Sequence, residues 1–213
     1  MKTDDLIGML ATGIEPVPRP TAPRRGAGAL AAGGPLAVAI MLAGYGPRRD
    51  LVQAMFWPML WVKILFPAFI AWGGFLMAQR LARPGVRVGL SWLLLAVPVL
   101  VVWTMALQSW FFQPAGERMP LVMGQTWRTC AMSIAMISTP TFVAGFVALK
   151  GLAPTRPAWA GAAVGALAGG AGAAVYALHC PELAAPFLAV WYVAGILILV
   201  ALGALLGPRV LRW

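Results

Sequence analysis

The chain has 213 residues, of which 61% are hydrophobic and only 10% are charged, and it carries a formal net charge of +10. Soluble domains have about 25% charged residues, so this composition excludes an ordinary water-soluble enzyme or binding domain. We expect an integral membrane protein whose basic loops face the anionic surface of a lipid bilayer. Because no basic run is interleaved with aromatic residues, we expect no direct contact with nucleic acid.

The first 15 residues predict a short helix with acidic residues in its first turn and apolar residues recurring on one face. A helix of this length is unstable alone in water, so we expect it to dock on a partner protein or to lie frayed on the membrane. Its candidate partner-binding residues are Asp4, Asp5, Leu6, Ile7 and Leu10. Residues 16–26, PVPRPTAPRRG, predict an extended Pro-rich spacer.

Six stretches are apolar enough for membrane-spanning helices, which need about 20 residues each. They lie near residues 27–45, 57–78, 88–108, 129–149, 158–178 and 187–206. The first stretch resembles the apolar part of a signal peptide, but the long lead and the five further spans favour a retained helix. The predicted fold is therefore all-α: a polytopic integral membrane protein whose six-transmembrane-helix bundle covers residues 27–208.

Basic residues indicate the orientation of these spans. An even number of spans puts both termini on one side, and loops rich in Lys and Arg face the cytoplasm. On the side of the termini stand Lys2, Arg19, Arg24, Arg25, Arg80, Arg83, Arg87, Lys150, Arg156, Arg209 and Arg212. The opposite loops hold only Arg48, Arg49, Arg118 and Arg128. We expect both termini, including residues 209–213, in the cytoplasm.

Lys63 is a charged residue inside the second expected span. Such a residue can serve an ion or proton relay, as in a small transporter. No expected span contains an acidic partner, so we favour a side chain that snorkels to the outer interface beside Trp57 and Trp61.

Small residues recur every fourth position in the fifth expected span, at Gly161, Gly165 and Gly169. This pattern allows another helix to approach closely. The partner is either a helix of the same chain or a second protomer, so an oligomer through this stripe is one of the two expectations.

The two cysteines of the chain are expected to meet. Cys130 opens the fourth span and Cys180 follows the fifth, and a short turn makes these spans antiparallel neighbours. Counted at about 1.5 Å per helical residue, both thiols return to the same outer level, facing the periplasm or its interface. The residues beside them that we expect to support the pair are Trp127, Arg128, His179 and Glu182.

Three interpretations of the cysteines stay open on the residues alone. In the first, they form a structural disulfide or stay as two inert buried thiols. In the second, they are a redox-active pair, since a helix N-terminus and the neighbouring Arg128 and His179 favour the thiolate form of a cysteine. The third is a metal site of Cys130, Cys180 and His179, with Glu182 as a fourth ligand. We expect no cofactor beyond such a transient metal ion.

The chain has no CxxC, HExxH, Walker-type glycine loop or Gly-x-Ser-x-Gly, so we expect no enzyme and no catalytic residues. The alternative is a membrane thiol-disulfide oxidoreductase or, with less support, a small transporter that depends on Lys63.

Five stretches stand in the order and spacing of a known family: KTDDLI, FWPMLWVKILFPAFIA, TWRTCAMSI, LHCPE and GALLGPRVLRW. With them the chain resembles the NrsF-like family of membrane anti-sigma factors, which are negative regulators of extracytoplasmic-function sigma factors. The resemblance implies six spans, an inner-membrane location and a cytoplasmic N-terminal segment that holds the sigma factor. It also implies a pair of outward cysteines needed for signalling, which by motif match are Cys130 and Cys180.

Overall fold

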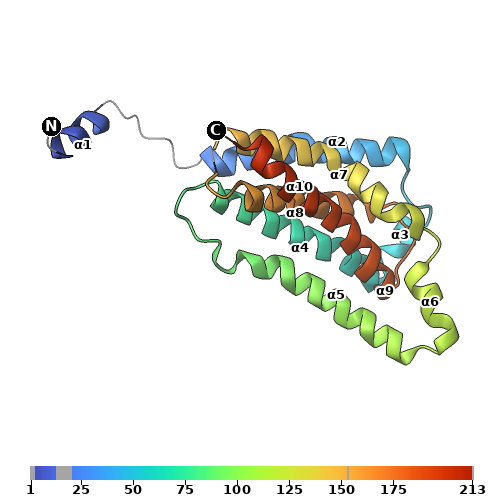
Figure 1. Cartoon of the computed structure of the whole chain (residues 1–213). Coiled ribbons are helices and arrows are strands. Elements are labelled where there is room, and N and C mark those ends of the chain that lie inside the picture. The colour runs from blue at the N-terminus through green and yellow to red at the C-terminus, as the bar shows by residue number, and fades with distance from the viewer. Residues whose placement is uncertain (1–2, 13–20, 153, 213) are drawn as a thin grey trace.

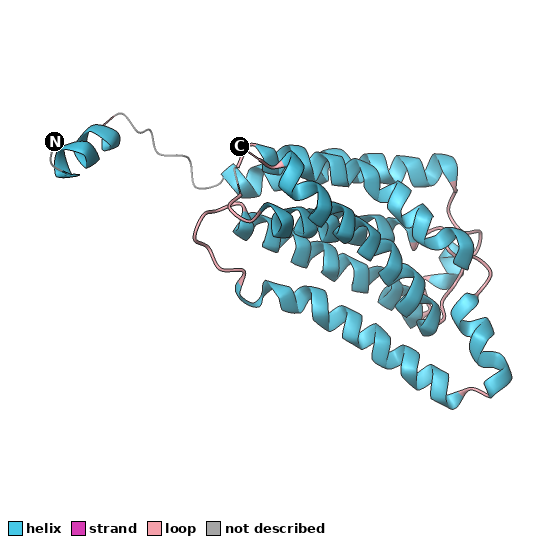
Figure 2. Ribbon diagram, in the orientation of Figure 1, coloured by secondary structure: helices cyan, strands magenta, loops and turns pink. Residues whose placement is uncertain are grey.

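A computed structural model describes residues 3–12, 21–152 and 154–212, and every regular element in these ranges is helical (Figures 1 and 2). In chain order the elements are α1 (Thr3–Ala11), α2 (Thr21–Gly44), α3 (Leu51–Ala54), α4 (Pro58–Leu81), the 3-10 turn η1 (Gly89–Trp92), α5 (Leu93–Phe112), α6 (Ala115–Met123), α7 (Trp127–Lys150), α8 (Pro157–Tyr176), α9 (Ala185–Phe187), the π-helical turn η2 (Leu188–Tyr192) and α10 (Val193–Val210). The prediction of an all-α fold is confirmed.

Six helical stretches of the described chain are long and apolar enough to cross a membrane. They are Ala22–Gly44, Pro58–Leu81, Gly89–Phe112, Ala115–Lys150, Pro157–Tyr176 and Ala185–Val210. Each contains most of one predicted span. Local signals set several of their ends: α4 and α8 begin with a proline, which needs no N–H partner in the first turn. Arg80, Lys150 and Arg209 lie in last turns, where positive charge offsets the helix dipole.

Three boundaries differ from the sequence prediction. Helix α2 begins at Thr21, inside the expected spacer, and residues 13–20 lie outside the described chain. Helix α6 occupies residues expected to form a loop, and α10 continues to Val210, into the expected C-terminal tail. At these three places the helix extends beyond the apolar stretch on which the prediction rested, because helical hydrogen bonding continues past the apolar core of a span.

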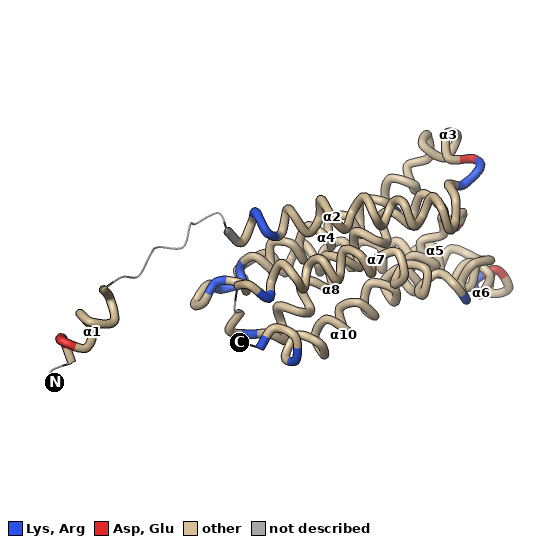
Figure 3. Tube along the Cα trace, turned by 90° about the horizontal axis from the view of Figure 1, so that it is seen from above, with Lys and Arg blue, Asp and Glu red and all other residues tan. Residues whose placement is uncertain are grey.

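Helix α8 is the centre of the bundle. It packs against α10, α4 and α7, and α2 covers α7 on the other side. Helix α5 contacts chiefly α4 and α9, and Figure 1 shows it leaning away at the edge of the bundle. Lys and Arg gather at the end of the bundle where the C-terminus lies, whereas α3 and α6 mark the opposite end (Figure 3).

The glycine stripe of α8 packs inside the same chain. Gly161 faces the backbone of Gly203, Gly165 faces Leu199, and Gly169 faces Ile196, all on α10. A Cβ atom at Gly161 or Gly165 would clash with a carbonyl oxygen of α10. The stripe is buried by this contact, so the structure supports the first of the two expected partners, a helix of the same chain, at Gly161, Gly165 and Gly169.

We predict that Gly165→Ala lowers the thermal stability of the protein whereas Gly28→Ala does not. Both changes replace a helical glycine and gain similar helix propensity, about 1 kcal/mol. The new methyl group at Gly165 meets the backbone of Leu199, and overpacking costs about 1–3 kcal/mol, whereas nothing lies within 4 Å of one at Gly28. Circular-dichroism melting of the purified chain in detergent measures the difference. Equal melting temperatures would contradict the packing described here.

Candidate functional site

The segment that follows α8 contains Cys180 and is referred to here as the Cys180 loop, residues 177–184. Its first amides continue the helical pattern, since Cys180 N–H donates to the carbonyl of Tyr176 at 3.1 Å. Pro181 then ends the helix, because it has no N–H group and disfavours helical geometry in the residue before it. The carbonyl oxygens of this stretch consequently lack partners within α8 and depend on groups from other elements.

The two cysteines meet at this loop. Cys130 lies in the first turn of α7, with its N–H bonded to the carbonyl of Thr126 at 3.0 Å. Both cysteines are free thiols in one buried cluster, and the Cys130 thiol lies close enough to Cys180 to lower the pKa of the Cys180 thiol. The hydroxyl of Thr126 lies 3.8 Å from the Cys180 sulfur. The prediction that distant segments bring both thiols to one level of the bundle is confirmed.

Neither thiol is exposed, and the side of the membrane that the pair faces stays a prediction. Cys130 and Cys180 are each 0% exposed and belong to the main apolar cluster together with Ile134 and Tyr176. Trp127 and Trp191 pack against this cluster, with their rings 5.4 Å apart. The pair is therefore enclosed within the end of the bundle that lies away from the C-terminus.

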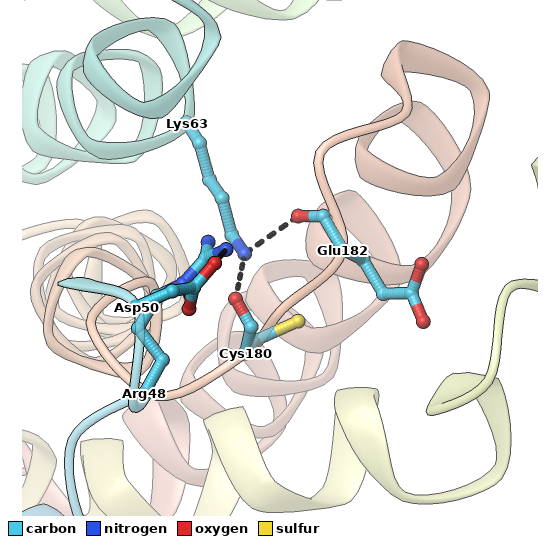
Figure 4. Close-up of polar contacts among 5 residues, drawn as sticks. All are labelled: Arg48, Asp50, Lys63, Cys180 and Glu182. Atoms are coloured by element: carbon cyan, nitrogen blue, oxygen red, sulfur yellow. Dashed lines mark hydrogen bonds and ion pairs between the residues drawn. The ribbon is translucent and has the colours of Figure 1, made fainter. Parts of the chain in front are cut away.

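Lys63 reaches the Cys180 loop from the second turn of α4 (Figure 4). Its ammonium donates to the carbonyl oxygen of Cys180 at 2.5 Å and to that of Glu182 at 2.7 Å. Its side chain is 0% exposed, so the expectation that Lys63 snorkels to the interface is wrong. The physical reason is that the carbonyl oxygens of Cys180 and Glu182, on either side of Pro181, provide acceptors for the ammonium inside the protein.

Three further contacts, from two other connections of the chain, fix the same loop. The Arg48 N–H donates to the carbonyl of Leu178 at 3.0 Å, and His179 Nδ1 lies 2.8 Å from the carbonyl oxygen of Gly46. The Glu182 carboxylate accepts the N–H of Gln125 at 2.6 Å. The loop is thus held by the α2–α3 connection, by α4 and by the α6–α7 connection, in addition to its own covalent links to α8 and α9.

The residues expected to support the cysteines divide into two groups. Glu182 shapes the loop by the bonds described above, and Trp127 packs beside the pair. Arg128 is exposed and lies over the ring of Trp127, 5.2 Å from its centroid. The ring of His179 packs against Tyr45 and Tyr176. Within the described ranges, no three His, Cys, Asp or Glu side chains are arranged to hold a metal ion.

Charges and hydrogen bonds around the loop change the pKa of the Cys180 thiol. The hydrogen bond from Cys130, the charge of Lys63 and the Thr126 hydroxyl lower the pKa of the Cys180 thiol below its ordinary range, although burial alone would raise it. At the edge of the site, the guanidinium of Arg48 forms a salt bridge of 2.7 Å with Asp50, and this hydrogen bond lowers the pKa of the Asp50 carboxyl. The site therefore favours a negatively charged sulfur at Cys180.

Sequence reasoning did not assign Lys63, Arg48 and Thr126 to the cysteine site. A signal was present for Lys63, since a lone lysine in an apolar span needs acceptors, and LHCPE contains a proline that frees them. For Arg48 and Thr126 the sequence offers no comparable signal, because their partners lie in segments far along the chain.

Comparisons with known proteins agree with the family resemblance. The model of the NrsF family, described as negative regulator of sigma F, matches residues 10–213. A probable anti-sigma-F factor NrsF from Azospira oryzae is 46% identical over 213 residues, which is 100% of both chains. An anti-sigma-F factor NrsF from Caulobacter vibrioides is 38% identical over 218 residues, again covering 100% of both chains. No solved structure matches the chain.

We predict that the Cys180 thiol titrates below the ordinary thiol value of about 8.5. In a Cys130→Ser chain the serine retains a hydrogen-bond donor and Cys180 is the only thiol left. The thiolate absorbance of this chain, taken as the difference from a Cys130→Ser/Cys180→Ser chain, should persist as pH falls and disappear only below that value. The same titration in a denaturing detergent is the control and should return the ordinary value. A folded-state midpoint at or above it would contradict the electrostatics of the site.

Proposed function

Because the chain belongs to the NrsF family of negative regulators of sigma F, we propose that it is an anti-sigma factor for a sigma factor of the extracytoplasmic-function class. The observation that carries this proposal is the full-length similarity to two relatives named as anti-sigma-F factors. Family membership suggests a regulatory protein rather than an enzyme. In its resting state the protein holds the sigma factor away from RNA polymerase and so represses a stress response.

The protein resides in the bacterial inner membrane with both termini in the cytoplasm. Six long apolar stretches support an integral location, and large apolar side chains such as Leu100, Val147 and Leu205 lie exposed on the outside of the bundle. The concentration of Lys and Arg at the end with the C-terminus supports the orientation (Figure 3). The Cys180 loop and Cys130 then lie at the periplasmic end.

Helix α1 is the docking element for the sigma factor. None of its residues is buried, and Ile7 and Leu10 are 58% and 66% exposed. No described segment of the chain covers the apolar face of this short helix. Such a helix is the usual form of an element that folds into a partner's groove. Asp4 and Asp5, in the first turn, would stabilise the docked helix through its dipole.

Cys130 and Cys180 sense the inducing signal, which is an oxidant or a thiol-reactive metal ion. An oxidant joins the two sulfurs in a disulfide and takes up their two protons and two electrons. A metal ion would bind the two thiolates, with His179 as a further ligand only after its ring leaves Gly46. Either event changes the loop and the packing of α7 and α8, and weakens the hold on the sigma factor.

The energies of these events can be compared with what a switch requires. Moving a two-state equilibrium from 1:99 to 99:1 takes about 5.5 kcal/mol. A disulfide contributes ~2–4 kcal/mol, which shifts such an equilibrium only part of this way, whereas a complete structural zinc site contributes ~10–16 kcal/mol. The alternative function, a thiol-disulfide oxidoreductase, is less well supported, because such an enzyme must present its cysteines to a substrate and both thiols here are 0% exposed.

We predict that Leu10→Asp weakens binding of the sigma factor at least about tenfold, ~1.4 kcal/mol, whereas Gly8→Asp has a much smaller effect. The two changes add the same charge to the same helix, but Leu10 lies on the apolar face and Gly8 on the opposite one. The affinity is measured by co-purification and titration of the full chain in detergent with the sigma factor. Equal effects of the two variants, or full binding after removal of residues 1–15, would refute docking through α1.

We also predict that Cys130→Ser and Cys180→Ser each prevent induction of the target genes by the signal, because each removes one sulfur of the buried pair. A reporter gene under the sigma factor measures induction, and immunoblotting checks that each variant accumulates. Normal induction in either variant would show that the pair is not the sensor.

A further inference from the structure

The ammonium group of Lys63 is fully enclosed in an apolar bundle, and its neighbours provide the interactions that replace water. Burying a charge is costly unless hydrogen bonds replace the lost water. Both hydrogen bonds given above go to backbone carbonyl oxygens of one short stretch, at Cys180 and Glu182. The ammonium also lies 5.4 Å from the centroid of the Tyr192 ring, in the π-helical turn η2 that follows the loop.

The two acceptors flank Pro181, so Lys63 fixes the chain immediately on each side of this residue. One acceptor belongs to the same residue as the reactive sulfur. Holding that carbonyl restricts the backbone of Cys180, and with it the range of positions that its sulfur can take against Cys130. Figure 4 shows the Lys63 side chain extending from α4 toward these two carbonyl groups.

Helix α4, which carries Lys63, is in turn packed closely along α8. Cβ atoms at Gly74 or Gly170 would clash with the backbone of Leu167 or Pro67 respectively, so the two helices leave no room between them. From Lys63 the helix continues to Arg80, about 26 Å away at 1.5 Å per residue. There the Arg80 guanidinium donates to the carbonyl of Val88 at 2.6 Å. One continuous helix thus joins the cysteine site to the basic end of the bundle.

We propose that Lys63 is the positioning residue of the thiol pair: through its two bonds to the Cys180 loop it holds Cys180 in register with Cys130 and ties the pair to helix α4. The proposal has two parts. That the tie to α4 transmits the signal rests on the proposed sensing function, whereas the positioning of the two sulfurs does not depend on that function. Loss of the ammonium gives the loop more freedom, so closing the pair into a disulfide becomes less favourable.

The test measures the equilibrium of the pair with glutathione in the purified full-length chain in lipid nanodiscs. The two thiols react with glutathione disulfide to give the Cys130–Cys180 disulfide and two molecules of glutathione, so the pair is oxidised and the glutathione disulfide is reduced. The Lys63 charge also stabilises the reduced pair as the Cys180 thiolate, so the constant of each variant is referred to fully protonated thiols by means of its measured Cys180 pKa. We expect Lys63→Met, whose side chain has a similar size but no charge and no donors, to lower this pH-independent constant at least tenfold. Lys63→Arg, which retains donors and charge, should recover most of the loss.

Lys150→Met is the matched control, since it removes an exposed lysine at the far end of α7. It should leave the constant unchanged. If Lys63→Met does not fold, Lys63→Gln takes its place, because glutamine retains N–H donors. Its equilibrium constant for disulfide formation should lie between that of the wild type and that of Lys63→Ala, which has no donors. An unchanged constant in folded Lys63→Met, no recovery by Lys63→Arg, or an equal loss in Lys150→Met would overturn the proposal.

A measurement of sigma-factor release distinguishes failure of the positioning role of Lys63 from failure of the proposed sensing function. In Lys63→Met, the glutathione redox ratio that releases the sigma factor should shift by the same factor as the disulfide constant. If release shifts while the constant does not, Lys63 acts elsewhere and the proposal fails. If the constant falls as expected but the wild-type protein releases no sigma factor on oxidation, the positioning role stands and the sensing function is wrong.

Discussion

Backbone carbonyl groups at the end of helix α8 must be paired without water, and the architecture of this end of the molecule follows from that requirement. Pro181 interrupts the helix inside an apolar environment, where an unpaired peptide group costs several kcal/mol. The Lys63 ammonium and the Arg48 amide supply donors to the freed carbonyls. Since these donors come from separate parts of the chain, pairing the loop also joins α4 and the α2–α3 connection to α8.

The same requirement explains why the two cysteines occupy a well-defined position. A loop held only at its ends samples many conformations, and a sulfur carried on it has no fixed neighbour. The Cys180 loop is held at Leu178, His179, Cys180 and Glu182, so its sulfur stays beside Cys130. Close backbone packing of α8 against α10 and α4 completes this arrangement, because helices in such contact cannot shift independently of one another.

Several parts of the fold could be predicted from the sequence for clear physical reasons. The six long helices follow from the length of the apolar stretches, and the meeting of Cys130 with Cys180 follows from two antiparallel helices joined by a short turn.

The conformations of single side chains could not be predicted in the same way. The expectation for Lys63 considered only lipid and water as its surroundings, whereas its acceptors are carbonyls 117 and 119 residues further along the chain. The ring of His179 faces Gly46, a contact that depends on how α2 and α8 are placed together. The spacing of the glycines in α8 is compatible with an internal and with an intermolecular partner helix, and only the folded chain shows that α10 covers them.

The complete burial of the two sulfurs has a kinetic consequence. A reagent can reach Cys130 or Cys180 only during transient openings of the surrounding structure, since neither residue has any exposed surface. At low reagent concentration the rate of modification rises in proportion to concentration, and at high concentration it levels off at the opening rate itself. The molecule therefore has a built-in maximum speed of response, which depends on the fluctuations of its closed end rather than on the chemical strength of the reagent.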